Sequence, residues 1–348
     1  MARSGSRADE ARPGEGLRVV SASPFNAETP LDVLHGVVTP TELHFVRSHF
    51  ALPEHPGSLT IGGAVGRSLA LTVEELRGRR ASSVVTTIEC AGNGRAFLDP
   101  PVTGEPWRLG AVGTAEWTGV PLGDLLDEAG LDRGVVEVLF RGADRGTPAD
   151  VGREIAFERS LPAAAVAGAI VAYAMNGRPL PPDHGAPLRL VVPGWYGVAS
   201  VKWLVEISAL TSPFRGFYQA DRYVIEDEPL TVMAPRAVIV SPADGARVAA
   251  GVMEIRGYAW SGGTTVDRVD LSVDGGSTWS PTSLGPAIGH AWRTWRHTWR
   301  PAAIGPAVLL ARATDARGDV QPIGQVRNAL GYRNNAAQPV AVEVVPPD

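Results

Sequence analysis

The sequence pattern changes near residue 226, and this change limits the folds open to the chain. From about residue 30 to 225, short helical patterns mix with strand patterns without a regular repeat, which favours an α+β domain. After residue 226 no helical pattern is convincing, and Pro/Gly turns recur about every ten residues, as an all-β sandwich of immunoglobulin-like type requires. We predict a flexible tail at residues 1–16, an α+β domain at 17–228 and a β-sandwich at 229–348.

Local signals support this division. Thr72 and Glu75 form a capping-box pattern that predicts a short helix. Residues 121–130 predict a second helix, which opens with Pro121 and ends at Gly130. Buried strands are expected at residues 135–140, 169–174 and 188–192, and a hairpin at 269–276. Most tryptophans of the second part are expected in its core, although so dense a cluster also suits an interface; they are Trp260, Trp279, Trp292, Trp295 and Trp299.

Composition excludes several kinds of partner and cofactor. A net charge of −5 on 348 residues argues against nucleic acid or an anionic membrane. A single cysteine excludes a disulfide framework, a Cys₂His₂ zinc site and a c-type haem. The longest apolar run, residues 163–175, is too short for a bilayer. With no twin arginine and no apolar N-terminal segment, we expect a cytoplasmic chain; an exported, periplasmic form would need a different start site.

The single cysteine, Cys90, follows a β-branched run and precedes a tight turn. Residues 84–88 predict a strand, and Ala-Gly-Asn-Gly at 91–94 forces the turn. The thiol is then expected beside backbone N–H groups and the guanidinium of Arg95, surroundings that favour the thiolate, which binds metals and attacks electrophiles. From these residues alone, a buried core cysteine and a hydrolase nucleophile with a histidine base stay open.

The segment Glu-Cys-Ala-Gly-Asn-Gly-Arg at residues 89–95 resembles the molybdenum-ligating segment of the sulfite oxidase family of molybdopterin enzymes. The segments at 45–49, 183–194 and 200–203 carry the same resemblance, which extends over roughly residues 30–345. It implies a sulfite-oxidase-like molybdopterin-binding domain followed by a dimerisation domain. It also implies that the Cys90 thiolate binds the molybdenum of a molybdopterin cofactor, where oxygen-atom transfer cycles Mo(VI) and Mo(IV).

The resemblance assigns roles to further residues. A pterin that ends in a phosphate needs cations, backbone donors and close glycines. The positions that match cofactor contacts are Phe45, Arg47, His49, Asp144, His184, Arg189, Ser200 and Lys202. The positions that match the substrate pocket are Arg47, Arg95, Trp107 and Tyr223, where arginines suit a small divalent anion and a phenol can donate a hydrogen bond or tune protonation. Taken alone, each residue also fits a strand edge, a turn or the core.

Two positions depart from the family pattern. Sulfite oxidases carry an arginine where this chain has Gly94 and another where it has Pro339. Because a hydrogen bond to a charged group contributes about 1.5–3 kcal/mol, we predict sulfite turnover that is detectable but poor, with a raised KM. The alternative within the family is reduction of a sulfoxide or another oxo-substrate.

The resemblance also implies partners. Since the chain has no haem signature, electrons would pass to an external carrier such as a cytochrome. The substrate would be a small oxyanion or oxo-compound, and a second copy of the chain would complete a homodimer. Two different classes of function compete with this interpretation: a hydrolase with Cys90 as nucleophile, and a non-catalytic binding module whose sandwich recognises a partner.

Overall fold

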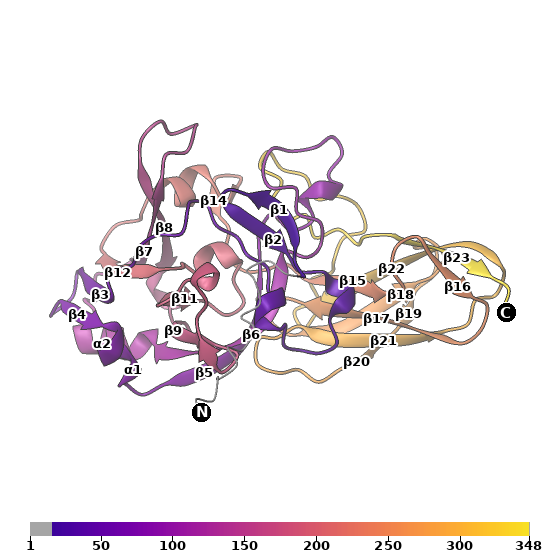
Figure 1. Ribbon diagram of the computed structural model, residues 1–348, viewed down its shortest axis with the longest axis horizontal. Coiled ribbons are helices and arrows are strands. Elements are labelled where there is room, and N and C mark those ends of the chain that lie inside the picture. Colours follow the sequence, from indigo (N-terminus) through magenta and orange to yellow (C-terminus); the bar gives the residue numbers. More distant parts are fainter. Residues whose placement is uncertain (1–15, 348) are drawn as a thin grey trace, which may run out of the picture.

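The structure is a computed structural model that describes residues 16–347, so the predicted tail lies outside the described residues except for its last position. Two parts lie side by side along the long axis, with the earlier half of the chain at the left of Figure 1 and the later half at the right. The longest α-helix in the described range has eight residues, and none there is long and apolar enough to cross a membrane.

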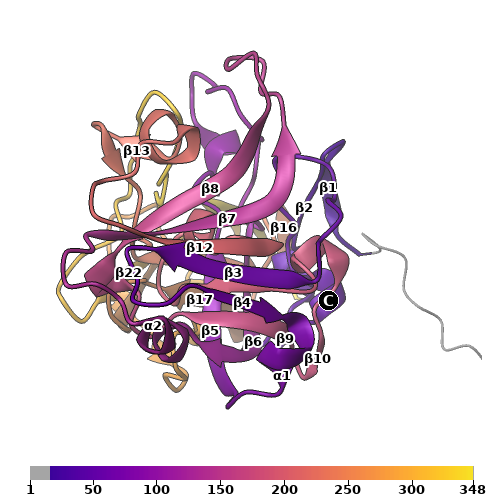
Figure 2. The ribbon, with the colours of Figure 1, turned by 90° about the vertical axis from the view of Figure 1, so that its left-hand side faces the viewer.

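Two five-stranded sheets form the first part. One sheet runs β10 (Arg178–Pro179), β9 (Ile170–Met175), β6 (Val112–Pro121), β5 (Ser82–Glu89), and β11 (Arg189–Val191) also pairs with β9. The other runs β4 (Leu69–Thr72), β3 (Ser58–Gly63), β12 (Leu204–Leu210), β7 (Glu137–Gly146), β8 (Ile155–Pro162). Figure 2 shows the second of these sheets above β5, β6 and β9. Two short hairpins are added, β1 (Arg18–Ala22) with β2 (Phe25–Glu28) and β13 (Val224–Ile225) with β14 (Glu228–Pro229).

Both predicted helices are present. Helix α1 (Val73–Arg77) begins with the capping box of Thr72 and Glu75. Helix α2 (Leu122–Ala129) buries its leucine face and ends at Gly130, whose φ of 70° suits glycine. The other helical turns are short: Leu31–Val33, Thr41–Leu43, Arg95–Phe97, Ala163–Ala165, Pro182–His184, Gly197–Ala199 and the π-type turn Phe217–Asp221.

The α+β expectation for the first part needs correction, because this part is mostly β with few helices. The two α-helices have only five and eight residues. Short apolar runs fit a strand as well as a helix. The predicted strands at 135–140, 169–174 and 188–192 lie within or overlap β7, β9 and β11, and the sheets take up most of the remaining sequence.

The second part is a sandwich of two sheets. One sheet runs β15 (Arg236–Ser241), β17 (Met253–Trp260), β21 (Arg293–Trp299), β20 (Ser283–Leu284). The other runs β16 (Ala246–Ala249), β23 (Val340–Val345), β22 (Gly305–Asp315), β18 (Val266–Ser272), β19 (Ser280–Pro281). The predicted hairpin is the antiparallel pair β18–β19. Of the five tryptophans, all except the half-exposed Trp279 are buried, as expected for core residues.

The second part covers an exposed edge of the first. Strand β5 is the last strand of its sheet, and such an edge leaves backbone groups unpaired. His290 supplies partners: its carbonyl accepts from the N–H of Thr87 (3.0 Å), and its own N–H donates to the carbonyl of Val85 (2.9 Å). The strand that leads into Cys90 is therefore bound along one edge by the second part.

Candidate functional site

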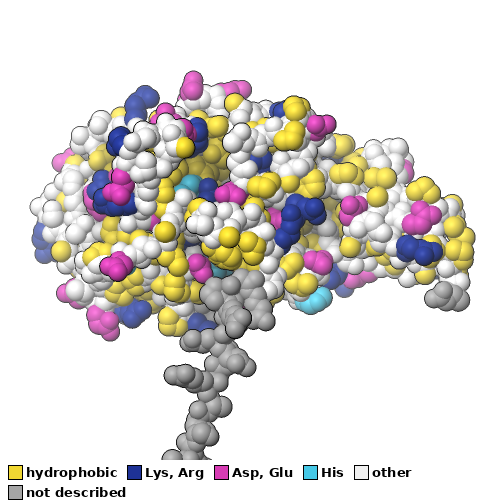
Figure 3. Space-filling view, turned by 45° about the horizontal axis from the view of Figure 1, so that its top comes forward, with side chains coloured by type: hydrophobic (Ala, Val, Ile, Leu, Met, Phe, Trp, Pro, Cys, Tyr) yellow, Lys and Arg dark blue, Asp and Glu magenta, His cyan; other side chains and the backbone are white. Residues whose placement is uncertain are grey.

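A cavity in the first part gathers most of the predicted site residues. Figure 3 shows a hollow where hydrophobic side chains surround a histidine and basic side chains, the mixture that lines this cavity. Ten of the twelve predicted residues line it: Phe45, Arg47, His49, Cys90, Asp144, His184, Arg189, Ser200, Lys202 and Tyr223. They come from segments up to about 180 residues apart, so that only the fold brings them together.

Cys90 lies at the end of β5, where the turn begins. Its N–H donates to the carbonyl of Ala111 (2.8 Å), and its carbonyl accepts from the N–H of Asn93 (2.9 Å). The expectation that the surroundings favour a thiolate is wrong for the metal-free thiol. Burial raises the pKa of Cys90, and this outweighs the opposite effects of Arg47 and the N–H of Gly92. A bound metal ion would deprotonate the thiol outright.

Arg47, His49 and Tyr223 form one group on the cavity wall. The Oη of Tyr223 lies 2.7 Å from Nε2 of His49. Burial raises the pKa of Tyr223, and burial with the nearby Arg47 and Lys202 holds the pKa of His49 well below its ordinary value. Burial disfavours the charge of Arg47, but Tyr223, Cys90 and Glu105 outweigh it and raise its pKa. The group therefore pairs one permanent cation with a neutral imidazole–phenol pair that can share a proton.

Lys202 and Arg189 carry the positive charge of the other wall. Lys202, the only lysine of the chain, donates to Oγ of Ser48 (2.8 Å) and to the carbonyl of Asp183 (2.9 Å). Burial and Arg189 lower its pKa to about 7, and burial lowers the pKa of Arg189 to about 9. Such shifts are expected of buried cations whose counter-charge is incomplete.

Unpartnered polar atoms lie on the same wall. Oδ1 of Asp144 and Nε of Arg189 are buried without a hydrogen-bond partner among the described residues, and burial raises the pKa of Asp144 to about 6. Buried polar groups are seldom left without a partner. The combination of two cations with free donors and acceptors fits a phosphate-bearing, polar ring system such as a pterin cofactor.

Arg95 and Trp107 are buried outside the cavity lining. Arg95 donates to the carbonyls of Glu105 (2.9 Å) and Leu330 (3.2 Å), and its guanidinium lies 5.2 Å from the centre of the Tyr332 ring. Trp107 is fully buried in the cluster that contains Cys90 and Phe45. Both keep a nitrogen without a partner in the described part of the chain, Nε and Nε1 respectively. Their placement brings neither side chain to the cavity wall.

Two contributors to the site had no clear signal in the sequence. His44 lines the cavity, and burial lowers its pKa to about 4; only its position beside the 45–49 segment could have indicated it. Tyr332 of the second part stacks on Tyr223, with ring centres 4.9 Å apart and planes 17° apart. Nothing near Tyr332 in the sequence indicates this contact.

Comparison with known proteins gives this arrangement a family. Residues 49–218 match the oxidoreductase molybdopterin binding domain, and residues 227–345 match the Mo-co oxidoreductase dimerisation domain. Sulfite oxidase of Gallus gallus is 39% identical over 92% of this chain and 76% of its own length. Mitochondrial sulfite oxidase of Homo sapiens is 35% identical over 95% and 66%, so this chain spans about two thirds of it. Sulfite oxidase of Arabidopsis thaliana is 31% identical over 92% of both chains.

A solved structure agrees with these relatives. The sulfane dehydrogenase SoxCD from Paracoccus pantotrophus superposes with a TM-score of 0.82 at 29% identity, covering 97% of this chain and 92% of that one. With 97% of this chain covered, the similarity includes both parts of the molecule. The resemblance found in the sequence is thus confirmed, and the chain belongs to the sulfite oxidase family as a molybdenum-dependent oxidoreductase that uses the molybdopterin cofactor.

Proposed function

We propose that this chain oxidises sulfite at a molybdenum centre held by Cys90 and passes the electrons to an external carrier such as a cytochrome. Sulfite and water give sulfate, two protons and two electrons, which the carrier accepts. The molybdenum cofactor supplies the two-electron oxygen-atom transfer when bound. One observation carries the proposal: the only thiol of the chain lies in the same cavity as Arg47 and the His49–Tyr223 pair.

The wall with Lys202 and Arg189 would hold the cofactor. Its two cations and the N–H and O–H donors around them suit a terminal phosphate. Asp144 and His184 can exchange hydrogen bonds with the polar edge of a pterin, and Phe45 offers an apolar surface. Ser200 helps to fix this wall, because its Oγ accepts a hydrogen bond from the N–H of Val192 (3.1 Å).

Arg47 and Tyr223 would serve the substrate. Arg47 lines the cavity, and its raised pKa keeps it positively charged, so it can attract and orient an oxyanion. The phenol of Tyr223 is neutral and bonded to a neutral His49. This pair can donate to a substrate oxygen and take up or release a proton as charge develops there.

A second substrate class has support of its own. Of the proposed substrate arginines, only Arg47 lines the cavity, while Arg95 is bound to protein carbonyls. Gly94 and Pro339 supply no charge. A site with one arginine is better suited to a singly charged or neutral sulfur compound than to a dianion, and the similar SoxCD is a sulfane dehydrogenase. Oxidation of a sulfane sulfur is therefore the second candidate function.

Steady-state kinetics of the molybdenum-loaded protein test both candidates. Sulfite and an alkyl persulfide, whose sulfane group carries at most one negative charge, would be offered with cytochrome c or ferricyanide as acceptor and an enzyme-free blank, and a sulfoxide with a reduced dye. We expect sulfite turnover with a raised KM. A low-micromolar KM would mean that other groups replace the missing cations. Turnover of the sulfoxide alone, by protein with full metal content, would contradict both candidates.

We further infer that residues 229–348 form an immunoglobulin-like sandwich that joins two copies of the chain, with residues 17–228 as the catalytic domain. The two stacked sheets and the match to a dimerisation domain support this. Light scattering of the full chain and of a variant truncated after residue 227 is the test. We expect a dimer and a monomer respectively; a full-length monomer at micromolar concentration would contradict the inference.

A further inference from the structure

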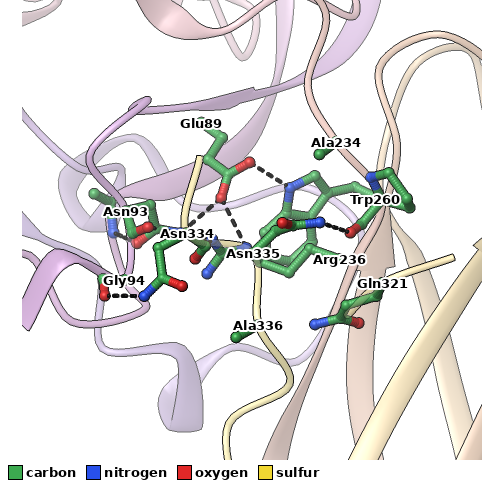
Figure 4. Close-up of polar contacts among 12 residues, drawn as sticks. Glu89, Asn93, Gly94, Ala234, Arg236, Trp260, Gln321, Asn334, Asn335 and Ala336 are labelled. Carbon is green, nitrogen blue, oxygen red and sulfur yellow. Dashed lines mark hydrogen bonds and ion pairs between the residues drawn. The ribbon is translucent and has the colours of Figure 1, made fainter. Parts of the chain in front are cut away.

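A buried carboxylate directly before Cys90 is bound by side chains of the second part. Glu89 is 1% exposed. Its Oε1 lies 3.1 Å from Nε of Arg236, and its Oε2 accepts from Nε1 of Trp260 at 2.9 Å. Arg236 and Trp260 face each other at the paired ends of β15 and β17. Figure 4 shows Trp260 and Arg236 reaching Glu89 from the right, where the second part lies.

The same contacts continue around the turn that carries Cys90. Asn93 donates its Nδ2 to Oε1 of Glu89 (3.0 Å), and its carbonyl accepts from Nη2 of Arg236 (3.2 Å). Nη2 of Arg236 also donates to the carbonyl of Asn334, whose own Nδ2 donates to the carbonyl of Gly94 (2.9 Å). The N–H of Arg333 donates to the carbonyl of Ala91 (2.8 Å). The second part therefore binds the turn both before and after Cys90.

Gly94 leaves room for this arrangement. A Cβ atom there would lie 2.8 Å from the carbonyl oxygen of Asn334 and 3.2 Å from Nη1 of Arg236, and the φ of 85° also favours glycine. Gly94 is one of the two positions where the family pattern has an arginine. In this chain a guanidinium reaches the same turn from the other part of the molecule, through Arg236.

We propose that Arg236, together with Trp260, is a positioning residue of the metal site. The two side chains fix Glu89 and Asn93, and through the backbone of the turn they fix the direction of the Cys90 sulfur. Neither lines the cavity, so neither touches substrate or cofactor. The inference rests on the proposed role of Cys90 as metal ligand, and it assigns the second part a task at the catalytic centre besides assembly.

The physical basis is the burial of the pair. Arg236 and Glu89 are 2% and 1% exposed, and a buried ion pair tolerates little change in geometry, since removing one partner leaves the other charge without compensation. Groups that bind the surroundings of a metal ligand orient that ligand. Their loss typically lowers metal affinity or activity by about 10- to 100-fold.

Two variants and a matched control test the proposal. Arg236→Met removes the cation, whereas Trp260→Phe removes the N–H donor to Glu89 and leaves a smaller aromatic ring at the position. Arg256→Met is the control: Arg256 also crosses between the two parts, donating to the carbonyl of Leu34 (3.1 Å), but it does not contact the turn. Cys90→Ser tests the ligand itself.

Three readouts would be measured on the full chain. Hydrogen exchange of amides 89–95 in the metal-free protein should be faster in Arg236→Met and Trp260→Phe. Molybdenum retained after dialysis should fall by about 10- to 100-fold in Arg236→Met and by less in Trp260→Phe. The sulfur-to-molybdenum absorption bands of the remaining loaded protein should shift. Arg256→Met should match the unmodified chain in all three.

The outcomes separate the positioning role of Arg236 and Trp260 from the proposed role of Cys90 as metal ligand. If Arg236→Met and Trp260→Phe are folded and behave like Arg256→Met in exchange, metal content and spectrum, the positioning role is wrong. If Arg236→Met does not fold, Trp260→Phe decides alone by the same criteria. If Cys90→Ser retains molybdenum with unchanged absorption bands, the proposed ligand is wrong. If it loses both while Arg236→Met keeps them, only the positioning role fails.

Discussion

The two ends of the cavity differ in how the protein balances charge. At the anchoring end (Asp144, His184, Arg189, Ser200 and Lys202) burial lowers the pKa of both cations. At the exchange end (Arg47, Cys90 and Tyr223) the surroundings raise the pKa of the cation Arg47. The anchoring end therefore holds surplus positive charge that an anion can neutralise. The exchange end holds a single cation, Arg47, beside a thiol and a phenol that burial keeps neutral, so it has less positive charge to offer a substrate.

Replacing Cys90 with Ser should have the largest effect, because it removes the one soft ligand of the exchange end. We expect turnover to fall to background while the fold is retained, since a hydroxyl is a poor substitute for a thiolate toward a soft metal. Turnover, metal content and circular dichroism would be measured together. Unchanged turnover would show that the metal is held without this thiol, and the distinction between the two ends would lose its basis.

Lys202→Met tests the anchoring end. Loss of one hydrogen bond from a charged group, about 1.5–3 kcal/mol, corresponds to cofactor binding that is weaker by about 10- to 150-fold. Pterin and molybdenum retained after gel filtration would be compared with those of the unmodified chain. Full cofactor content in Lys202→Met would mean that the surplus charge of this end does not serve the cofactor.

Arg47→Met and Arg95→Met sharpen the comparison within the exchange end. Arg47 lines the cavity, so its loss should raise the KM for sulfite about tenfold or more. Arg95 donates to two protein carbonyls, so its loss should change KM by less than about threefold while lowering thermal stability, because those carbonyls lose their donors. A larger rise in KM for Arg95→Met than for Arg47→Met would reverse this assignment.

A further prediction concerns the pH dependence of the stability of the metal-free protein. Burial lowers the pKa of His44 to about 4 and holds the pKa values of His49 and His184 well below 6.5. Between pH 4 and 6.5 the unfolded chain binds more protons at these sites, so stability rises with pH, by up to about 1.4 kcal/mol per pH unit for each histidine. Asp144, with its pKa raised to about 6, acts in the opposite direction for one proton.

Urea unfolding at several pH values between 5 and 6.5 measures this slope. His44→Gln should flatten it, because one of the histidines with a lowered pKa is removed. If the stability stays level or increases as the pH falls through this window, the pKa values of the buried histidines are not lowered and the prediction is wrong.

Local features of this molecule were predictable from the sequence, and long-range ones were not. The strand and turn around Cys90, the capping box at Thr72 and helix α2 depend on neighbours within a few residues. The partners of Glu89, in contrast, are Arg236 and Trp260, about 150 and 170 residues later in the chain. No spacing rule connects them, because the contact exists only once β15 and β17 meet the end of β5.

The direction of a side chain was equally beyond the sequence. Arg95 matches the family pattern in its position, but it begins a 3₁₀ turn and its guanidinium is bound by carbonyls of residues 105 and 330. The resemblance could therefore identify Arg95 by its position in the sequence, but it could not predict where the guanidinium of Arg95 lies. The overall β character was also underestimated, because short apolar runs do not distinguish strands from helices.

The anchoring end gives this protein a built-in chemical reporter. Lys202 is the only lysine among 348 residues, and its amine, with a pKa near 7, is largely uncharged and nucleophilic at pH 8. An amine-reactive reagent small enough to enter the cavity should label the cofactor-free protein at this side chain, apart from the chain's terminal amine. A bound phosphate would favour the ammonium form and block access, so the yield of one labelled peptide would count the fraction of molecules that lack the cofactor.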